Sequence, residues 1–374
     1  MLHRAARRTA LMVYCITMRA RTWILAGSVL AIFGCGVAVT RPLPDPRLDR
    51  WGVKDMDPSI AMQTPDAACV STTLVSTGGA FPKHPQTLAI RWTGFANFEL
   101  VYQGQIILLD AYFDRGSVFP PLGFKAADVT KADVMLIGHG HVDHMSDAAS
   151  VGNRTGAVIV GAPVTTEKLL TQGVDPGKVR TVTGRGGEVL KFKGFTVEPI
   201  LGRHGEPPQK VVAAFQSALK ETTTPPTKDQ LAELIAIRQR GTSDRRVIAE
   251  GTIAYLITLD NGFRIMYRDS GGVVTAYEQA AMDKVGGVDV ALVAVSAAVV
   301  NTLTVQRALE HMRAYRPEVY IPNHHDASFN NLWRATEPLF QALKDENPKL
   351  ITVSKGYREP VCFNTEYNLQ RRRK

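Results

Sequence analysis

The succession of apolar and polar positions along the chain predicts a mixture of strands and helices. Three segments have extended patterns with turn residues near their centre, which is typical of β-hairpins: 87–112, 189–200 and 252–270. Three others are continuously apolar, as strands buried on both faces are: 132–139, 157–163 and 288–296. Helices are expected at 165–171, 304–315 and 331–345, and short strands at 318–325 and 350–354. This order of elements predicts an α/β fold.

The main domain is expected over residues 86–360. A Pro-rich linker and N-terminal extension precede it at 40–85, and a basic tail follows it at 361–374, where the closing RRRK sequence is typical of a solvated end. Residues 207–247 read as an insertion that is rich in charge, with the segment ETTTPPTKDQ between two expected helices. Such an insertion is either a surface flap or a lid that controls specificity.

Residues 1–39 have the features of a targeting segment. A basic start, with Met18 as a second candidate initiator, precedes an apolar run from Trp23 to Val39. That run is short for a membrane span and suits a secretory signal. The residues IFGC place Cys35 where a bacterial lipoprotein carries its lipid, with simple cleavage or an uncleaved anchor as alternatives. We therefore expect export, to the bacterial periplasm or to a membrane-anchored state.

The composition is that of a globular protein, because 45% of the 374 residues are apolar and 21% are charged. The formal net charge is +9, and five arginines precede residue 35, where no acidic residue occurs, so losing the leader would leave nine minus five, or +4. This modest charge argues against nucleic-acid binding. Export would permit a disulfide between Cys69 and Cys362, and two separate buried thiols are the equal alternative.

The candidate chemistry is concentrated in the segment MLIGHGHVDHMSD, at the end of an apolar run. His139 and His141 lie two residues apart, so on an extended backbone their side chains point the same way. Asp143 and His144 follow beyond the strand, where a turn can direct them to the same volume. Imidazole and carboxylate ligands suit a divalent transition metal, zinc above all, with iron or manganese as alternatives. Core histidines with a helix cap are the plainer interpretation, and four such residues within six positions argue against it.

Further residues of the same chemistry follow other expected strands. His204 follows the segment FTVEPILG, Asp269 follows GFRIMYR, and Asp110 ends IILLD. His324 and His325 follow EVYIPN. Reactive groups of α/β folds gather at strand ends, so we expect these side chains to meet the first cluster.

The motif HGHVDH resembles the HxHxDH signature of the metallo-β-lactamase superfamily, and a lone His, an Asp and a late His follow in that family's order. The resemblance runs from about Leu88 to Ser354. The stretches RWTGFANFEL, IILLDAYF and IPNHH also resemble the branch that holds ascorbate-6-phosphate lactonase and the N-acyl-phosphatidylethanolamine-type phospholipase D. The resemblance implies a four-layer αββα sandwich, which some schemes class as α+β, with the site along one edge of its two sheets.

The resemblance also implies a role for each residue. The implied ligands of a first metal ion are His139, His141 and His204, those of a second are Asp143, His144 and His324, and Asp269 would bridge the two ions. Asp110 would orient a ligand imidazole, and it joins Asp143 as a candidate catalytic carboxylate. His324 is preferred to His325 as the ligand because it stands two residues after Pro322, where the branch has its ligand. His325 is then a candidate substrate-binding residue.

Two positions depart from the family's pattern without removing a ligand. Ala111 replaces the common Pro after Asp110, and Arg268 replaces the common Gly before Asp269. Arg268 is either an ordinary surface residue or a cation that neutralises an anionic substrate. It is therefore a second candidate for substrate binding.

The implied activity is hydrolysis by a water molecule shared between two metal ions, which lower its pKa from that of bulk water to near neutrality. The expected bond is an ester, lactone, amide or phosphodiester in a small-molecule or lipid-like substrate, and export favours lipid or cell-envelope compounds. No GxSxG motif occurs, in agreement with water as the nucleophile. An iron-dependent oxidoreductase and a non-catalytic binding protein of the same fold are the alternatives.

Overall fold

This computed structural model describes residues 66–205, 225–295, 302–326 and 336–366. The expected leader with Cys35, most of the linker, and part of the expected insertion lie outside these ranges. Within the described ranges, no helix is both long enough and apolar enough to cross a membrane.

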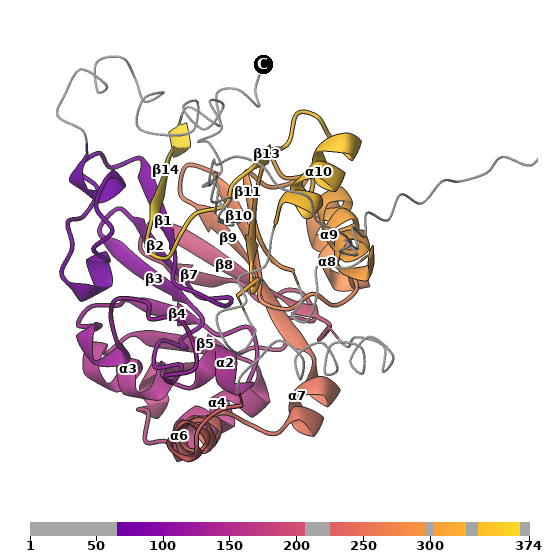
Figure 1. Ribbon diagram of the computed structural model, residues 1–374. Helices are drawn as coiled ribbons and strands as arrows, with labels where there is room; N and C mark the ends of the chain where they lie inside the picture. Colours follow the sequence, from indigo (N-terminus) through magenta and orange to yellow (C-terminus); the bar gives the residue numbers. More distant parts are fainter. Residues whose placement is uncertain (1–65, 206–224, 296–301, 327–335, 367–374) are drawn as a thin grey trace, which may run out of the picture. The chain divides into compact units, whose positions relative to one another are not determined.

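The described strands form two seven-stranded sheets (Figure 1). Neighbouring strands of the first sheet are β14 (Pro360–Asn364), β1 (Thr87–Trp92), β2 (Phe98–Tyr102), β3 (Gln105–Leu109), β4 (Val134–Leu136), β5 (Val158–Gly161) and β6 (Val179–Thr181). Those of the second are β13 (Ile351–Thr352), β12 (Val319–Asn323), β11 (Val290–Ala294), β10 (Arg264–Arg268), β9 (Thr252–Leu259), β8 (Phe195–Gly202) and β7 (Leu190–Phe192). Each sheet is antiparallel over four strands and parallel over the remainder.

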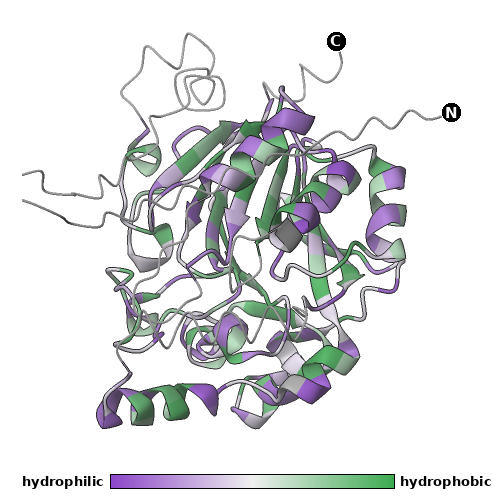
Figure 2. Cartoon of the chain, turned by 45° about the vertical axis from the view of Figure 1, so that its right-hand side comes forward, coloured by the Kyte–Doolittle hydropathy of each residue, from purple (hydrophilic) through white to green (hydrophobic). Residues whose placement is uncertain are grey.

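The two sheets pack face to face around a shared hydrophobic core, in which Phe98 and Leu100 of the first sheet meet Tyr255 and Tyr267 of the second. Helices cover the outer faces: α3 (Ala148–Thr155) and α4 (Pro163–Thr171) on the first sheet, and α8 (Ala276–Val285), α9 (Thr302–Tyr315) and α10 (Glu337–Glu346) on the second. Figure 2 shows the strands to be largely hydrophobic, whereas the helices also carry hydrophilic positions. The layers confirm the predicted αββα sandwich.

The turns of the predicted hairpins follow from local sequence. Gln103 and Gly104 adopt φ angles of 47° and 75°, the left-handed conformations that a two-residue hairpin turn requires. Gly262 (φ 87°) serves the same purpose between β9 and β10. Helix α8 begins with a reciprocal cap, because the Thr275 side chain accepts from the Glu278 amide and the Glu278 carboxylate accepts from the Thr275 amide.

Both predicted boundaries of the main domain were too narrow. Residues 361–364, assigned to a solvated tail, belong to β14 and pair with β1, and Phe363 is fully buried. Part of the expected linker also belongs to the domain, because the Glu99 carboxylate accepts hydrogen bonds from the amides of Val75 (3.1 Å) and Ser76 (2.7 Å). A disulfide joins Cys69 to Cys362 and decides between the two alternatives left open by the sequence.

The described part of the insertion holds two helices, α6 (Lys228–Arg238) and α7 (Asp244–Glu250). The stretch between these helices contacts the loop that carries His139 and His141. The Thr242 amide and hydroxyl both donate to the Gly140 carbonyl, at 2.8 and 2.7 Å. Arg240 pairs with the buried carboxylate of Asp147 at 2.9 Å. The insertion therefore supports the loop that carries the His-rich motif.

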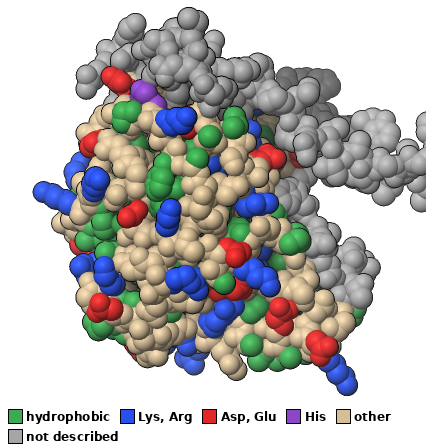
Figure 3. Space-filling model, turned by 90° about the vertical axis from the view of Figure 1, so that its left-hand side faces the viewer, with side chains coloured by type: hydrophobic (Ala, Val, Ile, Leu, Met, Phe, Trp, Pro, Cys, Tyr) green, Lys and Arg blue, Asp and Glu red, His purple; other side chains and the backbone are tan. Residues whose placement is uncertain are grey.

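The described surface mixes charges of both signs. On the face shown in Figure 3, Lys and Arg side chains are interspersed with Asp and Glu, and the described residues of that face form no continuous basic patch. The expected absence of nucleic-acid binding stays a prediction.

Candidate metal centre

The predicted site residues lie where strands of both sheets end. Asp110 directly follows β3, and His139 lies three residues beyond the end of β4. His204, Asp269 and His324 come after β8, β10 and β12. Asp110 and His324 have positive φ angles of 56° and 62°, a costly backbone conformation for residues other than glycine that is frequent at functional sites.

A short helix, α2 (Val142–Met145), carries the rest of the motif. His141 is its N-cap residue and still has an extended backbone, whereas Asp143 and His144 lie within its single turn. This change from extended to helical backbone allows four side chains within six residues to reach one volume.

The seven predicted ligands lie together. Among the described residues they form three overlapping groups whose ligand atoms lie within 4.8 Å of one another: His139, His141 and His204; His139, His144 and Asp269; and Asp143, His144 and His324. Asp269 connects the first group to the third, since its Oδ2 lies 2.5 Å from Nδ1 of His139 and 3.5 Å from Nδ1 of His144. The first and third groups have the membership that the sequence predicted for two metal ions, and Asp269 lies between them.

Two glycines of the motif make this convergence possible, and the sequence analysis missed both. A Cβ atom on Gly138 would lie 2.0 Å from Oδ2 of Asp269, far inside contact distance. A Cβ atom on Gly140 would lie 2.7 Å from the Thr242 hydroxyl. The alternation of Gly and His in GHGH could have indicated them, because a small residue beside each imidazole allows close approach by other segments.

Asp110 lies behind His144, as the resemblance implied. Its Oδ2 lies 2.6 Å from Nδ1 of His144 and accepts the Tyr267 hydroxyl at 2.6 Å, while its Oδ1 accepts the Gly138 amide at 2.8 Å. These bonds fix the carboxylate, which fixes the imidazole and leaves Nε2 of His144 directed toward Asp143 at 3.6 Å.

Burial keeps two of the imidazoles in the neutral form. Desolvation, aided by neighbouring imidazoles, lowers the pKa of His141 to about 3 and places the pKa of His139 well below 6.5. Both rings are therefore neutral at pH 7, the form that binds metals. For His144, burial also opposes protonation, but the carboxylates of Asp143 and Asp110 outweigh it and raise the pKa.

The donor set fits a transition-metal centre. Oδ1 of Asp269 and Nδ1 of His204 are buried atoms with no hydrogen-bond partner within the described part of the chain, and Nε2 of His324 lies 3.2 Å from Oδ2 of Asp143. Unpartnered buried polar atoms are uncommon, and a bound ion is one way to satisfy them. Imidazole nitrogens with carboxylate oxygens suit zinc and its neighbours.

The backbone of His324 is held by a network that sequence reasoning missed. The His324 amide donates to the Phe95 carbonyl (2.7 Å), and the Phe95 amide donates to Oδ1 of Asp326 (2.8 Å). Oδ2 of Asp326 accepts from Arg115 (2.7 Å) and from the Tyr357 hydroxyl (2.6 Å). These residues are far apart in the sequence, which left no local signal to find them.

His325 and Arg268 were candidates for substrate binding, and neither is among the described residues that line the pocket at the centre. His325 stacks on Trp92, with ring centroids 4.3 Å apart and an interplanar angle of 19°. Arg268 is fully buried, so the surface interpretation is wrong, and its guanidinium pairs with Glu278 of α8. Successive strand residues point to opposite faces, so Arg268 faces the helix layer when Asp269 faces the site.

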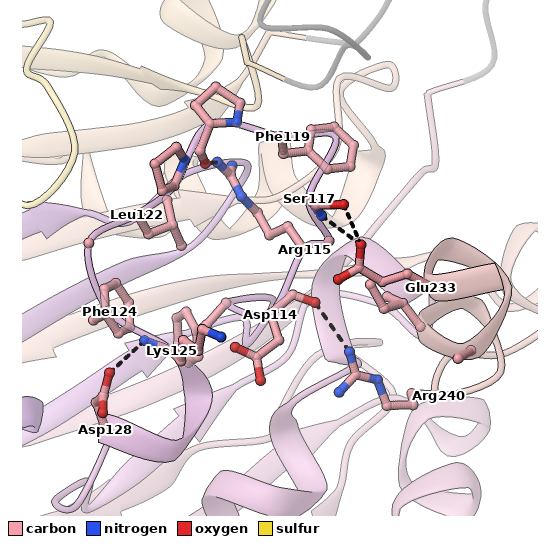
Figure 4. A pocket seen from close by; sticks show the side chains of 17 residues that line it. Asp114, Arg115, Ser117, Phe119, Leu122, Phe124, Lys125, Asp128, Glu233 and Arg240 are labelled. Carbon is pink, nitrogen blue, oxygen red and sulfur yellow. Dashed lines mark hydrogen bonds between the residues drawn. The ribbon is translucent and has the colours of Figure 1, made fainter. Parts of the chain in front are cut away.

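Two cavities adjoin these elements. The pocket at the centre has a volume of about 260 Å³ and is lined by the seven predicted ligands with Gly205, Ser270, Gly271 and Ala294. A larger cavity of about 1000 Å³ lies between residues 113–128 and helix α6 (Figure 4), where hydrogen bonds of 2.7 and 2.8 Å join Ser117 to Glu233. Described residues of the insertion line this second cavity together with residues of the loop at 113–128.

Comparison with known families agrees with this arrangement. The family model of the β-lactamase superfamily domain matches residues 89–324, which include all seven predicted ligands. The chain belongs to the β-lactamase superfamily. Its αββα sandwich is the superfamily's fold, and the HxHxDH resemblance is confirmed at this level, whereas membership of the lactonase and phospholipase branch stays a prediction.

Individual relatives of this superfamily member are distant. A UPF0173 metal-dependent hydrolase of Polynucleobacter asymbioticus is 26% identical over 277 residues, covering 73% of this chain and 85% of the relative. A UPF0173 metal-dependent hydrolase of Methanopyrus kandleri is 28% identical over 117 residues, 31% of this chain and 47% of that relative. The structure of Igni18, a metallo hydrolase of Ignicoccus hospitalis, matches with a TM-score of 0.52 and 17% identity over 74% of this chain and 98% of its own, and shows the fold alone.

Proposed function

We propose that this protein is a metal-dependent hydrolase that holds two divalent cations, most simply zinc. The observation that carries the proposal is the grouping of seven side chains into two sets of three with Asp269 between them, all around one pocket. The metal-dependent hydrolases among its relatives support the same reaction class.

Seven of the site residues would bind metal, and Asp110 orients one of them. His139, His141 and His204 would hold one ion, Asp143, His144 and His324 the other, and Asp269 both. When bound, the two ions supply an activated water and polarise the bond to be cleaved. Asp110 holds the proton of His144 on Nδ1, which keeps Nε2 available as a ligand atom.

Asp143 has a further role as the candidate catalytic carboxylate. Its side chain is 27% exposed, whereas the side chains of Asp110 and Asp269 are fully buried. It is therefore the carboxylate of the site placed to accept a hydrogen bond from a water molecule that enters the pocket.

The proposed substrates are small or lipid-like molecules with an ester, lactone, amide or phosphodiester bond. The resemblance of RWTGFANFEL and IPNHH to the lactonase and phospholipase branch supports this range. The pocket is small, about 260 Å³ among the described residues, so the reacting part of the substrate must be compact.

Metal analysis combined with a substrate screen tests the proposal. Purified wild-type protein should contain about two zinc ions per chain and hydrolyse at least one lactone, phosphodiester or acyl amide. His141→Ala should lose metal and activity, and His84→Ala, at a histidine remote from the site, should keep both. Iron with oxygen uptake would favour the oxidoreductase alternative, and a protein whose folding and activity ignore a strong chelator would refute a metal centre.

We also propose that the protein is exported. The basic and apolar leader supports this, as does the Cys69–Cys362 disulfide, because such bonds persist in oxidising compartments. A fusion of the full chain to a reporter active only in the periplasm should be active. Cys35→Ala should abolish incorporation of a labelled fatty acid if the leader carries a lipid, and a reporter active only in the cytoplasm would refute export.

A further inference from the structure

Arg268 and Glu278 form a buried ion pair that the proposed chemistry does not use. Both side chains are fully buried, and the pair lies between the second sheet and helices α8 and α9. Removing two charges from water is unfavourable unless hydrogen bonds satisfy them, so the partners of this pair indicate its purpose.

The guanidinium directs three of its N–H donors at the loops that carry two predicted ligands. Nε donates to the Ser270 carbonyl at 2.6 Å, and Nη2 donates to the carbonyls of Arg203 and Val273 at 3.0 and 3.2 Å. Nη1 donates to Glu278 and faces the Tyr315 hydroxyl at 3.5 Å. An arginine has five N–H donors, and each has an acceptor here.

Two of these acceptors adjoin predicted ligands. The Arg203 carbonyl belongs to the peptide unit shared with His204, and Ser270 directly follows Asp269. The strands before these ligands, β8 and β10, are not neighbours, because β9 lies between them. The guanidinium therefore joins two strand ends that the backbone ladder does not join.

The same loops also touch directly. The Gly205 amide donates to the Ser270 hydroxyl at 2.9 Å, and a Cβ atom on Gly272 would lie 1.9 Å from the Arg203 carbonyl oxygen. The Arg268 carbonyl accepts from the Asn323 side chain at 3.3 Å, one residue before His324. Arg268 thus contacts the segments of three predicted ligands.

Glu278 anchors this arrangement to a helix. One carboxylate oxygen accepts the Tyr315 hydroxyl at 2.5 Å, and the other accepts the Thr275 amide at 2.7 Å. The Thr275 hydroxyl donates to the Leu201 carbonyl of β8 at 2.7 Å. The pair is therefore connected to β8 both through Arg203 and through the first turn of α8.

We propose that Arg268, held by Glu278, is a positioning residue that sets the separation of His204 and Asp269 and thereby the metal affinity of the centre. The inference rests on the proposed metal centre. Lysine cannot replace this arginine, because a single ammonium cannot reach the Arg203 carbonyl, the Ser270 carbonyl and Glu278 at once.

Zinc affinity and cobalt spectra test the proposal without measuring catalysis. In Arg268→Lys, competition with a chromophoric chelator should show zinc binding 10- to 100-fold weaker than in wild type, the range found for residues behind metal ligands. The d–d absorption bands of the Co²⁺-loaded variant should also change. A double variant, Arg268→Met with Glu278→Gln, leaves no unpaired buried charge and should show the same loss.

Arg91 and Glu99 provide a matched control. They form another buried pair, 3.2 Å apart, in which Arg91 donates to the carbonyls of Ala68 and Ser71 in the N-terminal extension. Arg91→Lys should lower the melting temperature of the metal-free protein and leave zinc affinity and the Co²⁺ spectrum unchanged. Unchanged affinity in both Arg268 variants, or an equal loss in Arg91→Lys, would overturn the positioning role while the metal centre stands. A wild-type protein that binds no zinc would overturn both proposals.

Discussion

Replacement of Gly138 by alanine should impair the centre, because the added methyl group would collide with the carboxylate of Asp269. The added Cβ would lie 2.0 Å from Oδ2 and 2.1 Å from Cγ of Asp269, whereas ordinary contact begins at 3.4 Å. The two groups must therefore separate by 3.4 minus 2.0, or 1.4 Å, along the line to Oδ2. Asp269 is fully buried and close to His139, so neither side has room to move.

A displacement of this size has a predictable effect on the reaction. Misplacing a reacting group by about 1 Å lowers a rate by roughly 10²-fold, so Gly138→Ala should lower kcat/KM by about that factor. The assay is hydrolysis of the best substrate from the screen, with zinc content and circular dichroism measured on the same sample.

Gly177→Ala is the matched control, because its Cβ would meet only the side chain of Asp175 in an exposed turn, at 3.2 Å. That variant should keep wild-type activity. If Gly138→Ala binds two zinc ions and turns over at the wild-type rate, the close approach of Gly138 to Asp269 does not determine the geometry of the working centre.

Other parts of the structure give three further predictions. Asp110→Asn removes the charge that orients His144 and should weaken zinc binding by about 10- to 100-fold, measured by chelator competition. Reduction of the Cys69–Cys362 disulfide, which spans 293 residues, should lower the free energy of unfolding by about 2–5 kcal/mol in denaturant titrations, and no change would show that packing alone holds the extension. Burial places the pKa of the His311 imidazole well below 6.5 in the folded protein. As the pH drops below 6.5, the unfolded chain takes up a proton at this residue and the folded chain does not, so the free energy of unfolding falls by about 1 kcal/mol per pH unit. His311→Phe should flatten that dependence in the metal-free protein, and an unchanged pH profile would contradict it.

The predicted fold and ligand set depended on signals that are short in sequence. Turn residues such as Gln103 and Gly104 marked the hairpins, because only a few residue types tolerate the backbone they need. The ligands could be predicted because each follows an apolar strand, and strand ends gather at one edge. His204 and Asp269 were found in this way although 65 residues separate them.

What the sequence could not predict depends on contacts between distant segments. Arg268 was expected to be either a surface residue or a cation facing the substrate, because a charged side chain is seldom buried, and its partner Glu278 is recognisable only once α8 packs on the sheet. Asp326 supports His324 through the backbone of Phe95, which is 231 residues away, and Arg115, which is 211 residues away, pairs with the same carboxylate. The strand at 360–364 was obscured by the basic residues that follow it, and its partner β1 lies at the other end of the domain.

The pairing of β1 with β14 has a consequence for biosynthesis. Among the described strands, β1 is the first to leave the ribosome and is flanked on one side by β14, the last of them, so this hydrogen-bonding edge of β1 remains open until β14 has been made. An open edge is a template for pairing with other chains, and a product that stops before residue 360 would present one permanently. Truncated chains should therefore be prone to aggregation even when every ligand residue has been made.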